Sequence, residues 1–534
     1  MTSGTNGHPS AAWGGDGRFV LAIDLGTSGL KVGLLSLSGH VVYRECIPLQ
    51  TRFLEGGGAV QDAEHWWGIV ADVTRQAIAS RVVPAESIVA VGVTGQWGST
   101  VPVDETGRPV GDCIMWMDTR GGPHVQRRVG GFLQGYGPLA LAMWIRKTAG
   151  IPSTSGADPI GHMLHLDHDQ PDIAQRARWY LEPVDYLSMR FTGVAAASHA
   201  SMTAAWLTDN RDCGRLAYDD ALVRKAGVDP AKLAPLVATG SVIGTVRPDV
   251  AAELGIPASA QVFTGLPDLH SAGIGAGTVL DYEPHLAVST TSWISCPVPY
   301  KKTDVFHQIA TVPGLRADRY IIADNQDSAG QCLRWLRDNV LASSNGVATH
   351  DEIPWDALTG LAAQAPAGAN GVIFTPWLNG ERSPIDDPNA RGGFHNLSLG
   401  TSRPHLIRAV LEGVAQNTRW LHRTVERFTG RRLDHLRIIG GGAQADLWCQ
   451  IMADVLDRTI ERVDEPLHAN LRGMALFVAL SLEAIRLEDV RTLVPVHRTF
   501  EPNPANRAIY DAQHLEFTRL YDAQKGMFAR MKHN

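Results

Sequence analysis

The chain alternates between short apolar runs, which predict β-strands, and longer stretches with apolar residues every three to four positions, which predict helices. Phe19 to Leu25 is one apolar run, and a group of small residues separates it from a second run, Val32 to Leu37, so the pair predicts a β-hairpin. We expect a helix next, with Asp62 as its N-cap, and then a strand from Ser87 to Val93. This alternation predicts an α/β fold.

The same order of elements returns in the second half of the chain. Leu286 to Ser289 and Ile294 to Val298 predict a second hairpin around another hydroxyl-rich turn. A helix that starts at Pro404 and a strand from Leu436 to Ile439 follow. We therefore predict two similarly built lobes that face one cleft and join near Gly277.

Composition and charge exclude two classes of partner. The 534 residues carry 48 basic and 55 acidic side chains, a net charge of −7, so the sequence offers no basic surface for nucleic acid. The most apolar stretch, Gly473 to Leu482, is far shorter than the roughly 20 residues that cross a bilayer. We expect neither a nucleic-acid partner nor a membrane span.

The ends and the cysteines indicate a cytoplasmic protein. Residues 1–17 are polar and rich in glycine and lack the basic and apolar regions of a signal peptide, so they predict a disordered segment. The six cysteines stand far apart without a C-x-x-C pair, which argues against disulfides and zinc. A reducing cytoplasm is the expected location.

The turn after the first strand has the composition of a phosphate-binding loop. Backbone N–H groups at Gly26 can converge on an anion, the hydroxyls of Thr27 and Ser28 add donors, and Lys31 adds a positive charge. Asp24 at the strand end is placed to hold Mg²⁺, usually through water. The alternative is a tight turn whose side chains bond only to their own backbone.

A second candidate for chemistry follows the predicted strand Val262 to Thr264. Asp268 lies after this strand, where its carboxylate could accept a proton from an attacking hydroxyl, as phosphoryl transfer requires. It could equally be the N-cap of the following helix. The sequence does not separate the two roles.

Two other patterns need weighing. After a predicted strand, the sequence fits the pattern G-x-G-x-x-A at Gly440, Gly442 and Ala445, and Asp464 follows about twenty residues later. This is the spacing of a dinucleotide-binding unit, so an NAD-dependent oxidoreductase stays an alternative. Histidines at three-residue spacing, His162 to His168, would turn the outer two about 120° apart on a helix. They predict a solvated helix face rather than a metal site.

Several segments, in order along the chain, carry a resemblance to a known family. They read AIDLGTSGLKVGL, VQDAEHWW, VGVTGQ, WMDTR, FTGLPDLHSAGIGAG, LNGERSPIDDPNARGGFHNLSLGTSRPHLIRAVLEGVAQN and IIGGGAQADLWCQIMADVL. From about Phe19 to the last 20 residues the chain resembles the FGGY family of carbohydrate kinases, within the actin-like ATPase fold. The resemblance implies two RNase H-like lobes, at residues 18–277 and 278–534, which take up ATP, Mg²⁺ and a ketose of pentulose type or a polyol.

The resemblance also implies roles for individual residues. Asp268 would be the general base that deprotonates the substrate hydroxyl, and Asp24 would assist through the metal. The residues on the nucleotide side would be Asp24, Gly26, Thr27, Ser28, Lys31, Thr291, Gly330, Arg334, Gly441, Gly442, Gln444 and Asp446. Those around the sugar would be Gln96, Trp97, Trp116, Asp118 and Asp268.

Three departures from the family pattern bear on specificity. Where xylulose kinases of the family carry Met-His and Asp-Asn, this chain has Trp97-Gly98 and Asp268-Leu269, so two hydrogen-bonding side chains are missing. We therefore predict that D-xylulose is a poor substrate. The second turn reads Thr290 to Trp293 in place of Gly-Thr-Ser-Gly, which leaves the strength of ATP use open. A homodimer and a non-catalytic actin-like nucleotide switch also stay open.

Overall fold

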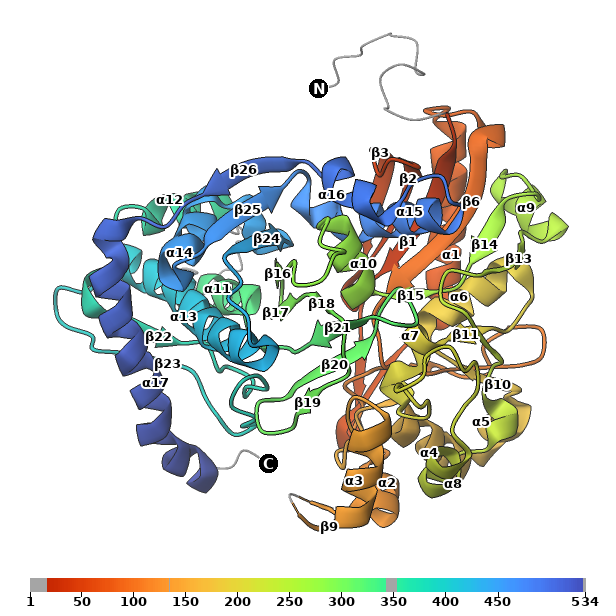
Figure 1. The fold of residues 1–534 in the computed structure, drawn as a ribbon, viewed down its shortest axis with the longest axis horizontal. Helices are drawn as coiled ribbons and strands as arrows, with labels where there is room; N and C mark the ends of the chain where they lie inside the picture. The colour runs from red at the N-terminus through yellow and green to blue at the C-terminus, as the bar shows by residue number, and fades with distance from the viewer. Residues whose placement is uncertain (1–16, 134, 342–352, 532–534) are drawn as a thin grey trace, which may run out of the picture.

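The computed structural model of the chain describes residues 17–133, 135–341 and 353–531. Figure 1 shows two groups of elements, each built around a central sheet, with the N-terminal half of the chain on one side and the C-terminal half on the other. The predicted disordered segment, residues 1–17, lies outside the described residues except for Gly17.

The first sheet begins with the predicted hairpin. Strands β1 (Phe19–Leu25) and β2 (Gly29–Ser36) pair antiparallel, and β6 (Ile88–Gly95) lies parallel to β1. The sheet order is β13 (Val242–Thr245), β14 (Gln261–Phe263), β6, β1, β2 and β3 (Val41–Pro48), with β15 (Leu266–Pro267) paired to the end of β6.

The second sheet repeats this plan, as the sequence predicts. Strands β16 (His285–Val288) and β17 (Ser292–Ser295) form a hairpin, and β24 (His435–Ile439) lies parallel to β16. The order is β17, β16, β24, β25 (Thr459–Val463) and β26 (Val496–Phe500). A separate four-stranded sheet contains β18 (Pro297–Val298), β21 (Tyr320–Ala323), β20 (Ile309–Pro313) and β19 (Thr303–Asp304).

Helices cover both sheets. In the N-terminal half they are α1 (Ala63–Ala79), α2 (Gly122–Val129), α3 (Pro138–Lys147), α4 (Pro159–Asp169), α5 (Pro171–Arg176), α6 (Pro183–Thr192), α7 (His199–Met202), α8 (Asp220–Ala226), α9 (Pro248–Leu254) and α10 (Asp268–Gly275). In the C-terminal half they are α11 (Gly330–Leu336), α12 (Trp355–Ala362), α13 (Arg403–Thr429), α14 (Asp446–Leu456), α15 (Ala469–Ser481), α16 (Val490–Leu493) and α17 (Arg507–Arg530).

Short strands complete the described structure outside these sheets. They are β4 (Arg52–Leu54), β5 (Gly58–Gln61) and β8 (Cys113–Ile114) in one sheet, the pairs β7 (Val101–Val103) with β10 (Trp179–Leu181), β11 (Ala197–Ser198) with β12 (Leu236–Val237) and β22 (Ile373–Thr375) with β23 (Gly393–His395), and β9 (Gly130–Leu133).

The two halves meet where α10 and α15 cross. A Cβ at Gly275 would collide with the carbonyl of Ala469, and a Cβ at Gly473 would collide with the carbonyl of Ser271. Only glycine lets the two helix backbones approach so closely. Apolar residues of α15 and of β1 and β6 share one core cluster, so α15 of the C-terminal half covers the first sheet. The lobe boundary at residues 277 and 278 therefore stays a prediction.

Local sequence signals set several element ends as predicted. The Asp62 carboxylate accepts hydrogen bonds from the backbone N–H groups of Glu64 and His65, and so caps α1. Helix α13 begins beside Pro404, with Ser402 as its N-cap.

The run Ile294 to Val298, expected as one strand, is divided between β17 and β18, which belong to different sheets. The chain therefore changes sheets at this point.

The expectation of a solvated histidine face on α4 was wrong for His162 and His165, although His168 is exposed. His162 is fully buried and His165 is nearly so. The His162 ring lies within hydrogen-bonding distance of the Thr100 hydroxyl, and His165 contacts Asp169 one turn later. The helix is buried because it packs against α2 and because polar partners satisfy one nitrogen of each ring.

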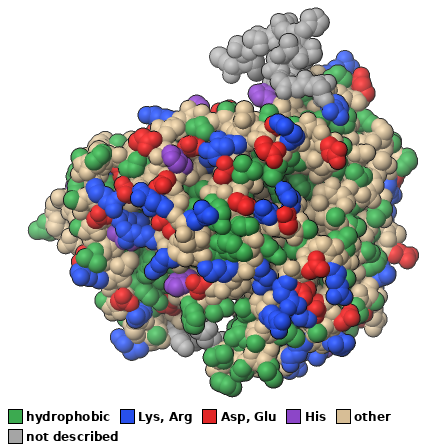
Figure 2. Space-filling model, in the orientation of Figure 1, with side chains coloured by type: hydrophobic (Ala, Val, Ile, Leu, Met, Phe, Trp, Pro, Cys, Tyr) green, Lys and Arg blue, Asp and Glu red, His purple; other side chains and the backbone are tan. Residues whose placement is uncertain are grey.

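The surface carries both signs of charge. On the face in Figure 2, basic and acidic side chains are interspersed. In the described part of the chain, no helix combines the length and apolar character that a membrane crossing needs.

Candidate active site

Strands β1, β6 and β15 end together at one edge of the first sheet. In register, Asp24 of β1 lies opposite Thr94 of β6, and Leu266 of β15 lies on the other side of Thr94. Asp268 comes two residues after Leu266 and is the first residue of α10. The fold therefore brings the two carboxylates singled out in the sequence to neighbouring strand ends.

Asp268 is a carboxylate in a perturbed environment. Burial, and next the negative charge of Asp24, raise its pKa from 3.8 to about 7. The backbone N–H of Leu269, which donates to Asp268 Oδ1 at 2.8 Å, and the charge of Lys31 act in the opposite direction. Pro267, not Asp268, is the N-cap of α10, so the capping alternative does not hold. The group is poised to exchange a proton near neutral pH.

Asp24 is buried and has one cationic partner. Lys31 Nζ donates to Asp24 Oδ2 at 2.7 Å across the hairpin, and the charge of Asp24 raises the pKa of Lys31 despite its burial. The turn between them is closed by a hydrogen bond from Gly26 N to Gly29 O at 2.9 Å. A carboxylate, an ammonium group and a tight small-residue turn thus lie together, as expected.

Thr27 connects this turn to the residues expected around the acceptor. The Trp116 indole Nε1 donates to Thr27 Oγ1 at 3.1 Å. The backbone N–H of Trp116 donates to Ser99 Oγ at 2.9 Å. Gln61 Nε2 donates to the Thr27 carbonyl at 2.8 Å. A change at the turn would therefore be felt at Trp116.

The segment Gln96 to Gly98 is held from three sides. Gln96 N donates to Leu25 O at 2.7 Å, which continues the pairing of β6 with β1. Trp97 Nε1 donates to the Ser201 carbonyl at 2.8 Å. Gly98 has φ of +83° and donates its N–H to Glu182 Oε2 at 3.0 Å. This left-handed backbone favours glycine at position 98 and disfavours the histidine that the family resemblance would place there.

The carboxylate of Asp118 already has hydrogen-bond donors within the protein. Its buried carboxylate accepts two hydrogen bonds to Oδ2 from Arg120, the shorter at 2.7 Å, and one from the backbone of Ala59 at 2.8 Å. Burial alone would raise the pKa of Asp118, but these hydrogen bonds and the Arg120 charge lower it overall. Asp118 therefore positions Arg120.

Each of the three departures from the family pattern contributes a side chain to one apolar cluster. Leu269 forms a small apolar cluster with Val312 and Ile321, and the side chains of Trp97 and Trp293 pack against it. The bulk of Trp293 thus lies in this cluster beside α10. Trp97 and Leu269 from the first half and Trp293 from the second therefore meet in this cluster.

Three nucleotide-side candidates of the second half, Gly330, Gly442 and Thr291, lie at the turn of the second hairpin. Gly330 N donates to Ser289 O at 2.7 Å, and a Cβ at position 330 would collide with that carbonyl. A Cβ at Gly442 would likewise collide with Val288. Thr291 lies in the same turn and is partly exposed. The second turn is therefore tightly packed by glycines from two other segments.

Asp446 does not stand free. It forms ion pairs with Arg462, at 2.6 Å, and with Arg498. Arg462 also lies 3.4 Å from the carbonyl oxygens of Ala443 and Gln444. Asp446 therefore orients an arginine that holds this loop. Gly441, Gln444 and Arg334 are exposed.

Some residues of the site were missed in the sequence. Glu182 lies 84 positions from its partner Gly98, so no local pattern indicates the contact. In the sequence, Arg120 is only the last residue of the segment WMDTR, and no pattern indicated its role. Ser271, whose hydroxyl accepts from Thr94 Oγ1 at 2.7 Å, ties β6 to α10. These three residues fix the backbone around the candidate base and acceptor side chains.

Comparison with known proteins identifies related sequences over nearly the whole chain. Residues 19–275 match the N-terminal domain of the FGGY family of carbohydrate kinases, and residues 294–482 match its C-terminal domain. A xylulose kinase of Staphylococcus epidermidis is 26% identical over 523 residues, which cover 96% of this chain and 98% of that protein. A gluconokinase of Bacillus subtilis is 26% identical over 447 residues, 83% of each chain.

A solved structure shows the same fold. The crystal structure of gluconate kinase from Lactobacillus acidophilus superposes with a TM-score of 0.84 at 20% identity, over 96% of this chain and all of the other. The two-lobed α/β arrangement predicted from the sequence is confirmed. The alternatives of an NAD-dependent oxidoreductase and a nucleotide switch gain no support from these matches.

Proposed function

The chain belongs to the FGGY family of carbohydrate kinases, and on that premise we propose that it transfers the γ-phosphoryl group of ATP to a hydroxyl of a ketose or polyol, with Asp268 as the general base. The observation that carries the proposal is the position of Asp268 beside Asp24 at the same sheet edge, where burial and the charge of Asp24 raise the pKa of Asp268 to about 7. A base with a pKa near the working pH is half ionised and still strong enough to take a hydroxyl proton.

In the transfer step, the ionised Asp268 orients the acceptor hydroxyl and takes its proton as the oxygen attacks the γ-phosphorus. The bond from the γ-phosphorus to the bridging oxygen breaks, and ADP leaves with that electron pair. Leu269 N–H, bound to Asp268 Oδ1, holds the carboxyl in place during the step. The proton therefore ends on Asp268.

The phosphate groups are held from both halves in this proposal. Gly26, Thr27 and Ser28 offer backbone and hydroxyl donors from the first turn, and Thr291 faces them from the second. Lys31 adds its charge beside Asp24. Gly330 maintains the second turn because only glycine fits against the Ser289 carbonyl.

Further along the nucleotide, Gly441, Gly442 and Gln444 would flank the adenosine. Arg334, exposed on the helix α11 that begins at Gly330, is a further candidate. Asp446 acts through Arg462, which holds the carbonyls of this loop, and is a positioning residue.

The donor set fits a magnesium ion. Asp24 supplies a buried carboxylate whose Oδ2 bonds to Lys31, and Asp268 lies near enough for their charges to interact. Carboxylate oxygen is a ligand that Mg²⁺ prefers, usually with several waters retained. When bound, the ion would neutralise charge on the phosphate oxygens.

The acceptor would lie against Gln96, Trp97 and Trp116, with Asp118 presenting Arg120. Position 98 contributes no side chain, and its left-handed φ disfavours the histidine that would bond a sugar hydroxyl. D-xylulose would therefore lose a hydrogen bond here, so we propose that another ketose or polyol is preferred.

The experiment is a panel of pentuloses, hexuloses and four- to six-carbon polyols with ATP, read out as ADP formed by the wild type and by Asp268→Asn. We expect one acceptor to stand out, and the variant to lose at least about 10²-fold in turnover on it while ATP binding is kept. Near wild-type turnover of Asp268→Asn would refute the proposed base.

A further inference from the structure

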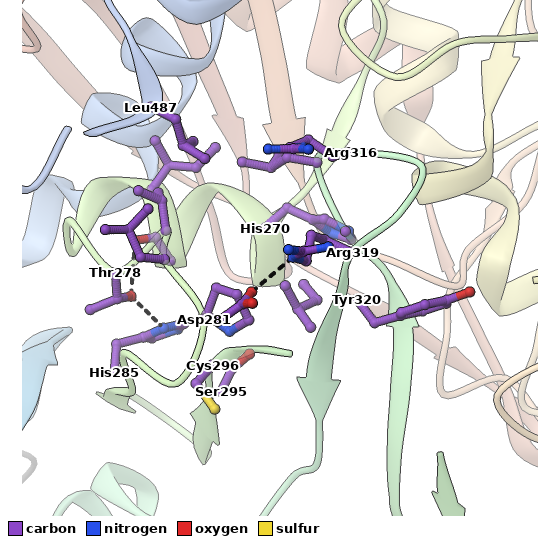
Figure 3. A pocket seen from close by; sticks show the side chains of 18 of the residues that line it. His270, Thr278, Asp281, His285, Ser295, Cys296, Arg316, Arg319, Tyr320 and Leu487 are labelled. Carbon is purple, nitrogen blue, oxygen red and sulfur yellow. Dashed lines mark hydrogen bonds and ion pairs between the residues drawn. The ribbon is translucent and has the colours of Figure 1, made fainter. Parts of the chain in front are cut away.

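A cavity of about 390 Å³ lies beside α10, with walls from both halves of the chain (Figure 3). Its walls come from α10, from the connection 278–281, from β16 to β18, from the connection between β20 and β21, from the start of β21, and from residues 487 and 488. No residue assigned above to the phosphates or the acceptor lines it. A cavity of this size suits a small organic molecule.

His270 brings an unpaired acceptor to this cavity. Its ring is 3% exposed, and Nε2 donates to the Pro313 carbonyl at 2.8 Å. Burial lowers the pKa of His270 to about 4, so the ring is neutral at pH 7 and Nδ1 carries a lone pair. Nδ1 has no hydrogen-bond partner within the described residues. Nδ1 itself has almost no accessible surface, so a ligand with an O–H or N–H group supplies this partner only by turning the ring.

His285 faces the cavity from the opposite wall (Figure 3). It is 2% exposed, and its Nδ1 lies 3.2 Å from Thr278 Oγ1. Burial lowers the pKa of His285 to about 3, so this ring is also neutral. Its Nε2 has no partner in the part of the chain that the structure describes. Two unpaired nitrogens with almost no accessible surface thus belong to side chains that line the cavity, and a ligand that turns either ring would pair its nitrogen.

The charged groups at the mouth balance one another. Arg319 Nε donates to Asp281 at 3.0 Å, and Arg316 Nε donates to Asp318 at 3.1 Å. Glu488 adds a further negative charge to the lining. Because both histidines are neutral, the cavity has no surplus positive charge, so an anionic ligand would be disfavoured.

The remaining lining is apolar and includes Leu269, Ile274, Val279, Leu315 and Ile321. A flat or compact ring could cover these side chains while its polar edge reaches a histidine. The charge balance and the apolar lining together indicate an uncharged ring.

The cavity is connected directly to the catalytic residues. Asp268 is the first residue of α10, and the next two residues, Leu269 and His270, both line the cavity. The His270 ring also meets the Trp97 ring edge to face, with centroids 6.3 Å apart. A molecule that moves His270 would move both the start of α10 and Trp97.

We propose that this cavity is a regulatory site for an uncharged ring compound with an O–H or N–H donor, which binds against His270 and His285 and changes the kinase rate through α10. The binding part stands independently of the proposed acceptor chemistry.

The first test measures binding by ¹⁹F NMR without ATP or acceptor, with 4-fluorophenol, fluorobenzene and 4-fluorobenzoate as probes. We expect 4-fluorophenol to bind with a Kd on the order of 1 mM. Fluorobenzene, which has no donor, and the benzoate anion should each bind at least fivefold more weakly. Equal binding of the three probes, or preference for the anion, would overturn the proposed ligand class.

Variants at Gly273 locate the binding. A Cβ at this helical position would come within 3.4 Å of His285 Cε1, an ordinary contact that narrows the cavity. Alanine is a better helix former than glycine, so Gly273→Ala should fold, and Gly273→Leu fills more of the space. The matched control is Gly360→Ala on α12, where a Cβ meets nothing within 4 Å.

We expect 4-fluorophenol binding to fall at least threefold in Gly273→Ala, further in Gly273→Leu, and not at all in Gly360→Ala. Unchanged binding in both Gly273 variants would overturn the site. Saturating 4-fluorophenol should change the rate of ATP-dependent phosphorylation at least twofold in the wild type and not in Gly273→Leu. Binding without a change of rate would overturn the regulatory part alone.

Discussion

Replacing Asp268 by asparagine should stabilise the protein while it removes activity. The pKa of Asp268 is about 7 in the folded chain against an ordinary value of 3.8, so the folded state resists ionisation of this group. Stability is therefore lost as pH rises from about 4 to about 7 and is level above that, because the unfolded chain releases the proton first. Asparagine carries no charge and keeps an oxygen for the Leu269 N–H.

The size of the effect follows from the pKa. At 1.36 kcal/mol for each unit of pKa, the rise corresponds to about 4 kcal/mol as an upper bound at pH 8. Partial exposure of the carboxyl reduces this, and we expect about 2 kcal/mol. For a lobe of this size, that raises the Tm by roughly 4 °C. At pH 5 the difference should shrink by more than half.

The assay is thermal unfolding of wild type and Asp268→Asn at pH 8 and pH 5, beside turnover at pH 8. Asp324→Asn is the matched control, since burial also raises the pKa of Asp324 to about 8 and no role in the reaction is assigned to it. That variant should gain stability and keep activity. A lower Tm of Asp268→Asn at pH 8 would refute the reasoning that burial and Asp24 strain this carboxylate.

Other predictions concern the base, the second turn and the acceptor. In the wild type, log kcat/KM should fall with a slope of 1 as the pH drops below about 7. Because the charge of Lys31 lowers the pKa of Asp268, this acidic part of the profile should move to higher pH in Lys31→Met. An unchanged profile would contradict the electrostatic coupling between the two residues. Gly330→Ala should raise the KM for ATP at least tenfold, because the added Cβ collides with the Ser289 carbonyl. Gly360→Ala is the control and should keep the wild-type KM. An unchanged KM in Gly330→Ala would show that the second turn is not part of the nucleotide site. In an acceptor panel, the kcat/KM of D-xylulose should be at least tenfold below that of the best acceptor. If D-xylulose has the highest kcat/KM of the panel, this assignment is wrong.

Features set by neighbouring residues were predictable from the sequence. The hairpin of β1 and β2 and the cap of α1 depend on residues a few positions apart, and the structure has both. The proximity of Asp24 to Lys31 follows from the hairpin register, in which the two residues lie opposite each other. The repeated order of elements likewise predicted two similar sheets.

Features set by distant residues were not predictable. Asp118 and Asp446 could be recognised as polar residues near the site, but the pairing of Asp446 with Arg498, 52 positions away, depends on the folded chain. The burial of His162 on α4 was missed because helical spacing describes only the helix itself, not the neighbours that cover it. The Glu182 contact to Gly98 was missed for the same reason.

The central claim is that a phosphoryl group passes from ATP to a sugar hydroxyl with Asp268 as the base. The most direct measurement is ³¹P NMR of ATP, Mg²⁺ and the best acceptor with the wild type and with Asp268→Asn. We predict that the wild type converts the γ-phosphate signal into a phosphate monoester of the acceptor, with one ADP formed for each ester, and that Asp268→Asn is at least about 10²-fold slower. Release of inorganic phosphate at the same rate with and without an acceptor, and no ester, would contradict the account.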